Sequence, residues 1–204
     1  MYKKYFKQLF DVIIVIPGIL IGLILMIPIA ITIYIEDKGP VFYNAERLGK
    51  NGKVFKMYKF RSMKVNAPDL RMADGSTFNG ENDPRLTKVG RFIRKTSLDE
   101  IPQLLNVLKG DMSLIGPRPD LPEHLEMYEG NEVRKLEVRP GITGYSQAYY
   151  RNSIKWKDRI RNDIFYIDNL SIKLDIMIIC RTIISVVKSD GVYVHEIEKG
   201  DNNE

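Results

Sequence analysis

The feature that most constrains this chain is an uncharged apolar run near its N-terminus. Val12 to Ile35 comprises 24 residues without a charged side chain, which would measure about 36 Å as one helix. The hydrocarbon core of a bilayer is about 30 Å thick. The run therefore predicts a membrane-inserted helix, because it is too long for a secretory signal peptide and lacks a small-residue cleavage site.

Charge and proline content leave two arrangements open for this run. Lys3, Lys4 and Lys7 precede it and favour a cytoplasmic N-terminus. The rest of the chain is also expected in the cytoplasm, because it is basic and can form no intramolecular disulfide. Both flanks cannot lie on one side of a straight spanning helix. Pro17 and Pro28 predict a bend, and a bent helix that enters and leaves the same leaflet would satisfy both flanks. An ordinary spanning helix with a mild kink is the alternative.

The remaining composition is that of a mildly basic protein. The chain has 204 residues, with 31 Lys and Arg against 26 Asp and Glu, which suits contact with anionic lipid or phosphate groups. It has no concentrated Lys/Arg block, so nucleic acid is not expected as a partner. The single cysteine, Cys180, cannot form an intramolecular disulfide, and its apolar context predicts a small buried side chain. His124 and His195 lack partners at metal-ligand spacing and are expected at the surface.

Beyond residue 38 the residue patterns predict a helix-rich α/β fold with one short β-hairpin. Residues 39–63 form the hairpin around the turn GKNG, and the polar residues 64–84 form a long, mobile loop that could cover a substrate. A short strand is predicted at DMSLI, and helices are predicted over 85–97, 101–108 (ending at Gly110), 120–137 (broken near Gly130), 153–169 and 171–188. The chain thus divides into a membrane-inserted segment (1–38), a main domain (39–191) and a polar tail (192–204).

The helix predicted over 153–169 has two interpretations. Trp156, Ile160, Ile164 and Ile167 share one side, whereas basic residues populate the other. A basic amphipathic helix with a tryptophan is typical of a membrane surface, and the same pattern is typical of a helix packed on a protein core. The pattern alone favours core packing. The fold class predicted for the whole chain nevertheless includes membrane-surface amphipathic helices beside a re-entrant membrane helix.

The octet TSLDEIPQ at residues 96–103 places two carboxylates side by side. A capping box from Ser97 to Glu100 would put Pro102 at the fifth helical position, where proline removes a hydrogen bond. With Asp99 as N-cap, Pro102 falls in the first turn, where a missing N–H costs nothing. The helix is therefore predicted to begin at or beside Asp99, with the helix dipole and the nearby Arg94 and Lys95 keeping the carboxylate ionised. Such a carboxylate can cap a helix, bind a divalent cation or attack phosphorus.

Two further segments carry phosphate-binding chemistry. GPRP fixes Arg118 in a rigid turn, and an arginine on a stiff backbone suits bidentate phosphate recognition. RPGITG supplies glycines and free amides that could approach a phosphate. The patterns GxxxxGK[ST], HExxH and GxSxG do not occur. With the membrane segment, these features indicate phosphate transfer to or from a membrane component.

The segments YKFRSM, SLDEIPQLLNVLKGDMSLIGPRP and VRPGITG, in this order behind an apolar N-terminus, resemble the bacterial sugar transferases. These are small monotopic phosphoglycosyl transferases that begin glycan assembly on polyprenol phosphate at the cytoplasmic face of the bacterial cell membrane. The resemblance covers nearly the whole chain and implies a re-entrant membrane helix. The chain departs from the family where Ile16–Pro17 and Ile27–Pro28 replace a frequent Ser-Pro step. It also has GYSQAYYRN in place of the commoner GxAQVNGRN, so a sugar preference does not carry over.

The resemblance also implies a mechanism. A UDP-sugar is held with Mg²⁺, and Asp99 contacts the metal and attacks the sugar-linked phosphate, so that UMP leaves. Polyprenol (undecaprenyl) phosphate then takes the phosphosugar from the aspartate. Glu100 assists by accepting a proton or placing the metal. The family's phosphate-binding and substrate-binding positions fall on Arg118, Lys59, Arg94, Asp163 and Arg139.

Two other functions are consistent with the residues. A membrane-anchored, metal-dependent phosphohydrolase would use the same carboxylates to hold a metal and activate water. A non-enzymatic module would bind anionic lipid through its basic faces. The sequence leaves the sugar, the glycan pathway and the oligomeric state open, a homodimer included.

Overall fold

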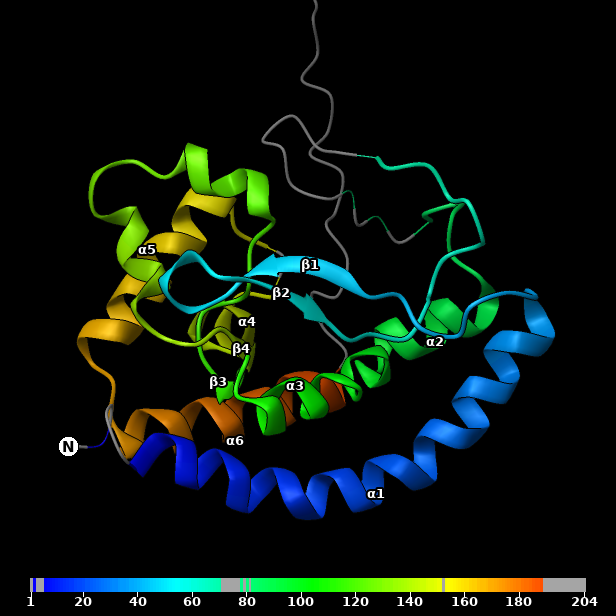
Figure 1. Ribbon diagram of the computed structural model, residues 1–204, viewed down its shortest axis with the longest axis horizontal. Coiled ribbons are helices and arrows are strands. Elements are labelled where there is room, and N and C mark those ends of the chain that lie inside the picture. The colour runs from blue at the N-terminus through cyan, green and yellow to red at the C-terminus, as the bar shows by residue number, and fades with distance from the viewer. Residues whose placement is uncertain are drawn as a thin grey trace, which may run out of the picture.

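One long helix lies beneath the rest of the molecule in the computed structural model, in the view of Figure 1. This helix, α1, runs from Lys7 to Glu36 and remains helical across Pro17 and Pro28. Figure 1 shows it curving upward towards its C-terminal end. A bend in the apolar run is therefore confirmed.

The structure describes Tyr2, residues 6–70, Phe78, Gly80, residues 82–151 and residues 153–188. Several predictions fall wholly or partly elsewhere in the chain. Positions 71–77, 79 and 81 of the predicted loop, the tail at 192–204 and His195 lie outside the described residues.

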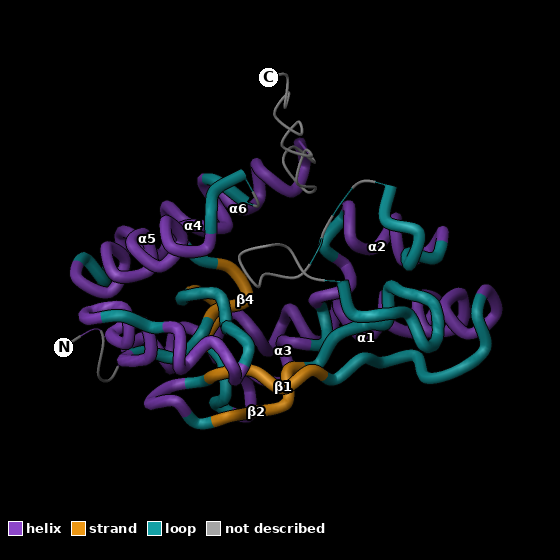
Figure 2. Tube along the Cα trace, turned by 90° about the horizontal axis from the view of Figure 1, so that it is seen from above, coloured by secondary structure: helices purple, strands orange, loops and turns teal. Residues whose placement is uncertain are grey.

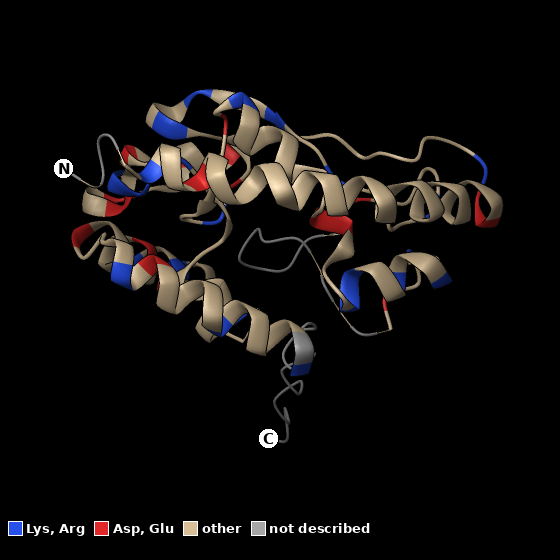
Figure 3. Ribbon diagram, turned by 90° about the horizontal axis from the view of Figure 1, so that it is seen from below, with Lys and Arg blue, Asp and Glu red and all other residues tan. Residues whose placement is uncertain are grey.

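Most of α1 faces away from the domain. Val15, Gly22 and Ile33 are buried against it, but only 11% of the most apolar 18-residue stretch is buried. A core helix of a soluble protein would be mostly buried, whereas α1 is long and apolar enough to cross a membrane. Seen from below, its ribbon carries almost no charged residue between its two ends (Figure 3). These properties indicate membrane association.

Polar contacts anchor the N-terminal end of α1 to the domain. Lys7 Nζ lies 2.8 Å from Asp175 Oδ2 on helix α6 (Ile172–Lys188), and both side chains are buried. One turn further on, Asp11 Oδ2 accepts a hydrogen bond of 2.6 Å from Ser113 Oγ. Because buried charges are costly unless they are paired, these contacts fix where α1 begins on the domain.

A second set of polar contacts anchors the C-terminal end of α1. The Glu36 carboxylate accepts hydrogen bonds of 2.6 and 2.8 Å from the first two amides of helix α2 (Lys88–Lys95). A carboxylate at a helix N-terminus satisfies amides that have no intrahelical partner. The next residue, Asp37, accepts a hydrogen bond of 3.0 Å from Arg61 Nη1. Both ends of α1 are therefore bound to the same domain.

Two small sheets position the central loops. Strands β1 (Ala45–Leu48) and β2 (Val54–Met57) form the predicted antiparallel hairpin around the turn η2 (Lys50–Gly52), and Phe42 pairs with Phe60 further along it. Strands β3 (Ser113–Ile115) and β4 (Gly141–Thr143) form a parallel pair. Only β3 was predicted as a strand, since a parallel partner distant in sequence leaves no local signal.

The predicted helices are present with shorter bounds, which confirms the helix-rich part of the fold class. The segment predicted over 120–137 consists of two 3₁₀ segments that break at Gly130, in place of an α-helix. Seen from above, α4, α5 and α6 gather towards one end of the molecule and α2 lies towards the other (Figure 2). Besides α1, α2 and α6, the elements are η3 (Leu98–Glu100), α3 (Gln103–Lys109), η4 (Pro122–Met127), η5 (Gly130–Glu137), α4 (Tyr145–Tyr149) and α5 (Trp156–Asp168).

Helix α5 packs its apolar side into the core. Trp156, Ile160 and Ile167 are all buried, which supports the core-packing interpretation of this segment. Two predictions for single residues are wrong. His124 is buried, with its ring 4.8 Å from that of Trp156 between centroids, because η4 folds over the start of α5. Cys180 is exposed, because α6 turns part of its apolar surface outward.

Candidate active site

The adjacent carboxylates of η3 lie where three separate segments meet. Lys59, two residues after β2, places its Nζ 2.8 Å from Asp99 Oδ2 and 3.5 Å from Glu100 Oε1. Arg118, in the turn after β3, places Nη1 and Nη2 each 3.4 Å from Glu100 Oε1. The structure therefore brings together four of the residues predicted to form the site.

The backbone around Asp99 differs from the prediction. Ser97 adopts a left-handed conformation (φ +58°) and its side chain caps nothing, so a capping box is absent. The chain then makes one 3₁₀ turn, and α3 begins only after Pro102. The prediction that an α-helix starts at Asp99 is wrong, because the left-handed turn at Ser97 inserts a separate short segment. The Asp99 carbonyl accepts a hydrogen bond of 3.0 Å from Phe60 N, which holds this segment against the strand that delivers Lys59.

The Asp99 carboxylate is less acidic than predicted. Burial raises the pKa of Asp99 above its ordinary value, and the negative charge of Glu100 adds to the shift. Lys59 and Arg94 oppose it only in part. No α-helix begins at Asp99, so the predicted helix dipole does not act there. Arg94 favours the ionised form as predicted, and Lys59 favours it more strongly through an ion pair.

Glu100 has the opposite shift. Burial alone would raise its pKa, but Lys59 and Arg118 hold the pKa of Glu100 below its ordinary value. Two neighbouring carboxylates thus differ in character, one desolvated and one held ionised by two cations. Opposite pKa shifts of this kind are common where two paired carboxylates have different catalytic roles.

Close backbone contact fixes the turn that carries Arg118. A Cβ added to Gly141 would lie 2.1 Å from Gly116 N, and one added to Gly144 would lie 2.1 Å from Gly116 O. The Gly141 amide donates to Pro117 O at 2.9 Å. The sequence had suggested that amides of this turn are free to bind a phosphate. The Gly141 amide is not free, because it is already bonded to Pro117 O. The glycines instead let the GPRP and RPGITG turns pack backbone to backbone.

The other predicted site residues lie in different surroundings. Arg94, on α2, lies close enough for its charge to favour the ionised forms of Asp99 and Asp83. Arg139 donates to Gln8 Oε1 of α1 at 3.1 Å. Asp163, on α5, has an ion pair with Lys135, with 3.0 Å between the charged atoms.

Asp163 belongs to a buried cluster beneath the GPRP turn. Lys135 Nζ lies 2.6 Å from Asp120 Oδ2. The side chains of Lys135 and Asp163 are almost fully buried, and that of Asp120 is 11% exposed. Trp156 Nε1 donates to Asp120 Oδ1 at 3.2 Å, and the Asp120 carbonyl accepts from Leu48 N. Asp120 is two residues from Arg118, so the cluster supports the turn. Sequence reasoning missed Asp120 and Lys135, and the one available signal was the position of Asp120 directly after PRP.

Asp163 should give this cluster a pH dependence. Burial raises the pKa of Asp163 from 3.8 to about 6. Since the folded state holds this proton more tightly than the unfolded chain, the free energy of unfolding should fall as the pH rises from about 4 to about 6. We expect Asp163→Asn to remove that contribution, about 2–3 kcal/mol, in denaturation experiments at both pH values. The same slope in variant and wild type would contradict this expectation.

The model of the family described as bacterial sugar transferase matches residues 2–189. The chain belongs to the bacterial sugar transferase family. The resemblance inferred from the three motif segments is therefore confirmed.

Three relatives illustrate the range of similarity. The uncharacterized sugar transferase EpsL of Bacillus subtilis (strain 168) is 45% identical over 171 residues, 84% of this chain and 81% of the relative. The undecaprenyl-phosphate galactose phosphotransferase of Salmonella typhimurium (strain LT2) is 41% identical, over 94% of this chain and 42% of the relative. The UDP-N-acetylgalactosamine-undecaprenyl-phosphate N-acetylgalactosaminephosphotransferase of Aeromonas hydrophila is 39% identical, over 82% and 40% respectively. The chain thus spans less than half the length of the latter two.

The carboxylate pair fits a magnesium ion that is shared with a substrate. Mg²⁺ usually binds one or two carboxylates together with substrate phosphates. Asp99 and Glu100 provide such a pair, whereas no group of three or more His, Cys, Asp or Glu side chains suited to hold a metal occurs in the described part of the chain. Two carboxylates alone would leave most of the coordination positions of such an ion to other ligands.

Proposed function

We propose that this chain transfers a phosphosugar from a UDP-sugar to polyprenol (undecaprenyl) phosphate, releasing UMP and starting the assembly of a surface glycan. The single observation that carries the proposal is the buried Asp99 carboxylate, paired with Lys59 at 2.8 Å beside a Glu100 that Lys59 and Arg118 hold ionised. The names of the Salmonella and Aeromonas relatives support undecaprenyl phosphate as the acceptor, and the name of the Aeromonas relative also supports a UDP-sugar donor.

In this proposal Asp99 is the nucleophile. One of its carboxylate oxygens forms a bond to the sugar-linked phosphorus, the bond from that phosphorus to the bridging oxygen breaks, and UMP leaves with the electron pair. A phosphate oxygen of the acceptor then attacks the same phosphorus, and the Asp99 carboxylate leaves. The product is polyprenol-diphospho-sugar.

The neighbouring residues have supporting roles. Lys59 and Arg118 stabilise negative charge on the transferring phosphate, and Glu100 accepts a proton from the acceptor phosphate or helps to place the metal. Mg²⁺, bound beside Asp99, would neutralise the diphosphate and favour the departure of UMP. Arg94, Arg139 and Asp163 contribute to substrate binding, the last through the turn that carries Arg118.

The membrane arrangement is also a proposal. Because both ends of α1 bind the same domain, a helix that enters and leaves one leaflet keeps every anchoring contact, whereas a straight spanning helix breaks one set. We place the domain (39–191) at the cytoplasmic face, with α1 inserted and the exposed apolar side chains of α6, such as Ile176 and Ile183, at the membrane surface.

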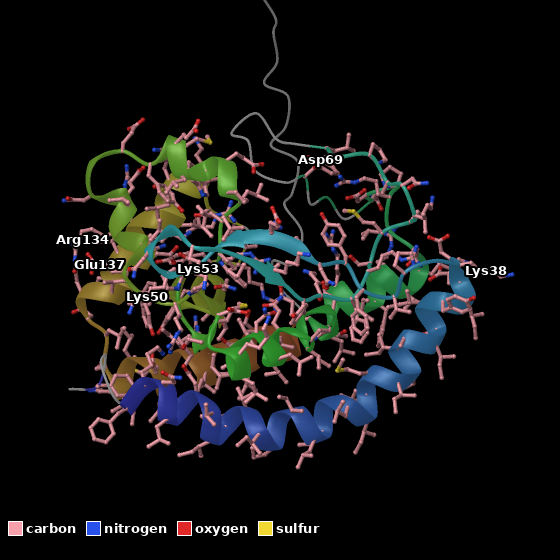
Figure 4. The ribbon with its side chains drawn as sticks, viewed as in Figure 1. Lys38, Lys50, Lys53, Asp69, Arg134 and Glu137 are labelled. Atoms are coloured by element: carbon pink, nitrogen blue, oxygen red, sulfur yellow. The ribbon has the colours of Figure 1, made fainter. Side chains whose placement is uncertain are left out.

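Site-directed labelling tests this arrangement. Gln8→Cys and Lys38→Cys, each in a Cys180→Ser background, place one thiol near each end of α1. Lys38 points outward beyond the C-terminal end of the helix, on the other side of the molecule from Lys50 and Lys53 of the hairpin turn (Figure 4). In inside-out membrane vesicles a membrane-impermeant maleimide should label both thiols. Labelling of only one of them would indicate a spanning helix.

Omitting the acceptor tests the chemistry. With a panel of UDP-sugars and Mg²⁺ but no polyprenol phosphate, the enzyme should release about one UMP per molecule and then stop, and added undecaprenyl phosphate should restart turnover. Continuous release of sugar phosphate without lipid would instead indicate a phosphohydrolase.

Arg118→Ala tests the phosphate-binding role of the GPRP turn. We expect kcat/KM for the UDP-sugar to fall about 10²–10³-fold, because one preorganised cationic contact is lost. Stability should change little, since the side chain is 42% exposed. Arg134→Ala is the matched control, because its side chain is 36% exposed and it pairs with Glu137 and Asp168 away from the site. Equal activity of the two variants would exclude the role.

A further inference from the structure

An apolar groove lies between the C-terminal part of α1 and α2. Its volume is about 470 Å³, within the usual range for small-molecule sites. Pro28, Ile29 and Thr32 form one wall, and Val89, Phe92 and Ile93 form the other. Phe92 is 60% exposed although it is aromatic, so the groove presents apolar surface that the described residues leave uncovered.

The buried wall of this groove packs against residues that neighbour the catalytic residues in the chain. Ile93 packs in a buried cluster with Phe60 and against Leu98. Phe60 follows Lys59 in the chain, and Leu98 precedes Asp99. The groove therefore shares a hydrophobic cluster with the residues that stand next to Lys59 and Asp99 in the chain.

The charge around the groove suits a lipid with an anionic head. Lys88, the one charged residue among those lining the described groove, is exposed. The sequence of α2, KVGRFIRK, has four cations and no acid, and the charge of Arg94 reaches Asp99. The Glu36 carboxylate, at the start of α2, accepts hydrogen bonds from the first two amides of that helix. An apolar groove formed by a helix with four cations and no acid fits a hydrocarbon chain that ends in a phosphate.

The groove is also continuous with the surface that α1 exposes. Pro28 and Phe92, on opposite walls, are both exposed, and Ile27 and Ile31 beside them on α1 are exposed as well. A chain that leaves the groove along α1 would therefore pass directly onto the apolar surface that faces the membrane.

We propose that this groove seats the isoprene units of the polyprenol phosphate next to its phosphate, and so aligns the acceptor with the phosphosugar on Asp99. The inference rests on the proposed function and adds the acceptor's binding site to it. Extraction of the whole lipid from the bilayer is unnecessary, because only the first units enter the groove and the rest of the chain stays in the membrane.

A pair of tryptophan variants tests this site. Thr32→Trp places a large side chain in the groove, and Ile31→Trp places the same side chain on the next residue of α1, which is 53% exposed and does not line the groove. For the full chain in lipid nanodiscs, Thr32→Trp should raise the KM for undecaprenyl phosphate at least about tenfold, since excluding even a few methylenes has such a cost. The KM for the UDP-sugar and the UMP burst without acceptor should be unchanged, and Ile31→Trp should match wild type.

Two outcomes would overturn the proposal. One is an unchanged acceptor KM in Thr32→Trp, and the other is an equal rise in both variants, which would indicate a general effect on α1. Phe92→Ser, which opens the exposed wall, provides a second variant and should raise the same KM.

Photocrosslinking separates failure of this inference from failure of the proposed function. Polyprenol phosphate with a diazirine in its first isoprene units should label peptides from α1 and α2 around Thr32 and Phe92, and unlabelled lipid should compete. If wild type shows no UMP burst, the proposed function fails, yet the labelled peptides still decide where the lipid binds. Labelling elsewhere on the chain would refute the groove.

Discussion

Asp99→Asn is expected to lower turnover by about 10⁴-fold or more, because a carboxamide oxygen cannot form the phosphosugar intermediate. The expected readout is the loss of the single UMP released per enzyme in the absence of acceptor. With donor labelled in the sugar-linked phosphate, wild type should carry the label on the protein and the variant should not. Both measurements report the first bond-forming step and do not depend on the lipid.

The stability of Asp99→Asn should move in the opposite direction to its activity. Burial raises the pKa of Asp99, so the ionised carboxylate is held at a cost to the folded state. The variant removes this charge without changing the shape of the side chain, and Lys59 retains Glu100 as a partner. We expect an equal or higher melting temperature than wild type, which would show that lost activity is not lost folding.

A matched aspartate provides the control for this experiment. Asp168→Asn changes a half-exposed carboxylate that pairs with Arg134 at the surface, and it should retain both the UMP burst and turnover. Full turnover in Asp99→Asn would contradict a covalent mechanism through this residue and would require another nucleophile.

Lys135→Met is expected to destabilise the protein by about 3–5 kcal/mol, because it leaves two buried carboxylates without the cation they share. Lys135 is buried and lies 2.6 Å from Asp120 and 3.0 Å from Asp163 between charged atoms. The loss should appear as a lower midpoint of urea unfolding in detergent micelles. Activity should fall as well, since Asp120 connects the cluster to the turn that holds Arg118.

Two comparisons establish that buried charge causes this effect. Lys53→Met, on the exposed hairpin turn, should change stability by no more than about 0.5 kcal/mol. Adding Asp163→Asn to Lys135→Met should recover part of the loss, because one of the two unpaired charges is then removed. Equal stability of Lys135→Met and Lys53→Met would mean that the cluster does not depend on this ion pair.

The sequence predicted the parts of this protein that depend on local patterns. The uncharged run predicted a long, bent helix, and the turn GKNG predicted the hairpin. Gly110 predicted the end of α3, and it has a φ of +81° in the structure. Asp99 and Glu100 lie together simply because they are consecutive in the chain. Their association with Arg118 and Lys59 came from resemblance to the family, because nothing local relates segments so far apart in the chain.

Tertiary structure decided the surroundings of those residues. Burial, which depends on every segment packed around a side chain, raised the pKa of Asp99 against the prediction. It also made Lys135 the partner of two carboxylates, although Lys135 stands in a polar, surface-like sequence. The attachment of both ends of α1 to one domain likewise depends on residues far apart, such as Lys7 with Asp175. The sequence by itself determined which groups could do the chemistry and that a helix meets the membrane. The fold alone decided which charges are desolvated and paired, because desolvation and pairing arise from contacts between distant parts of the chain.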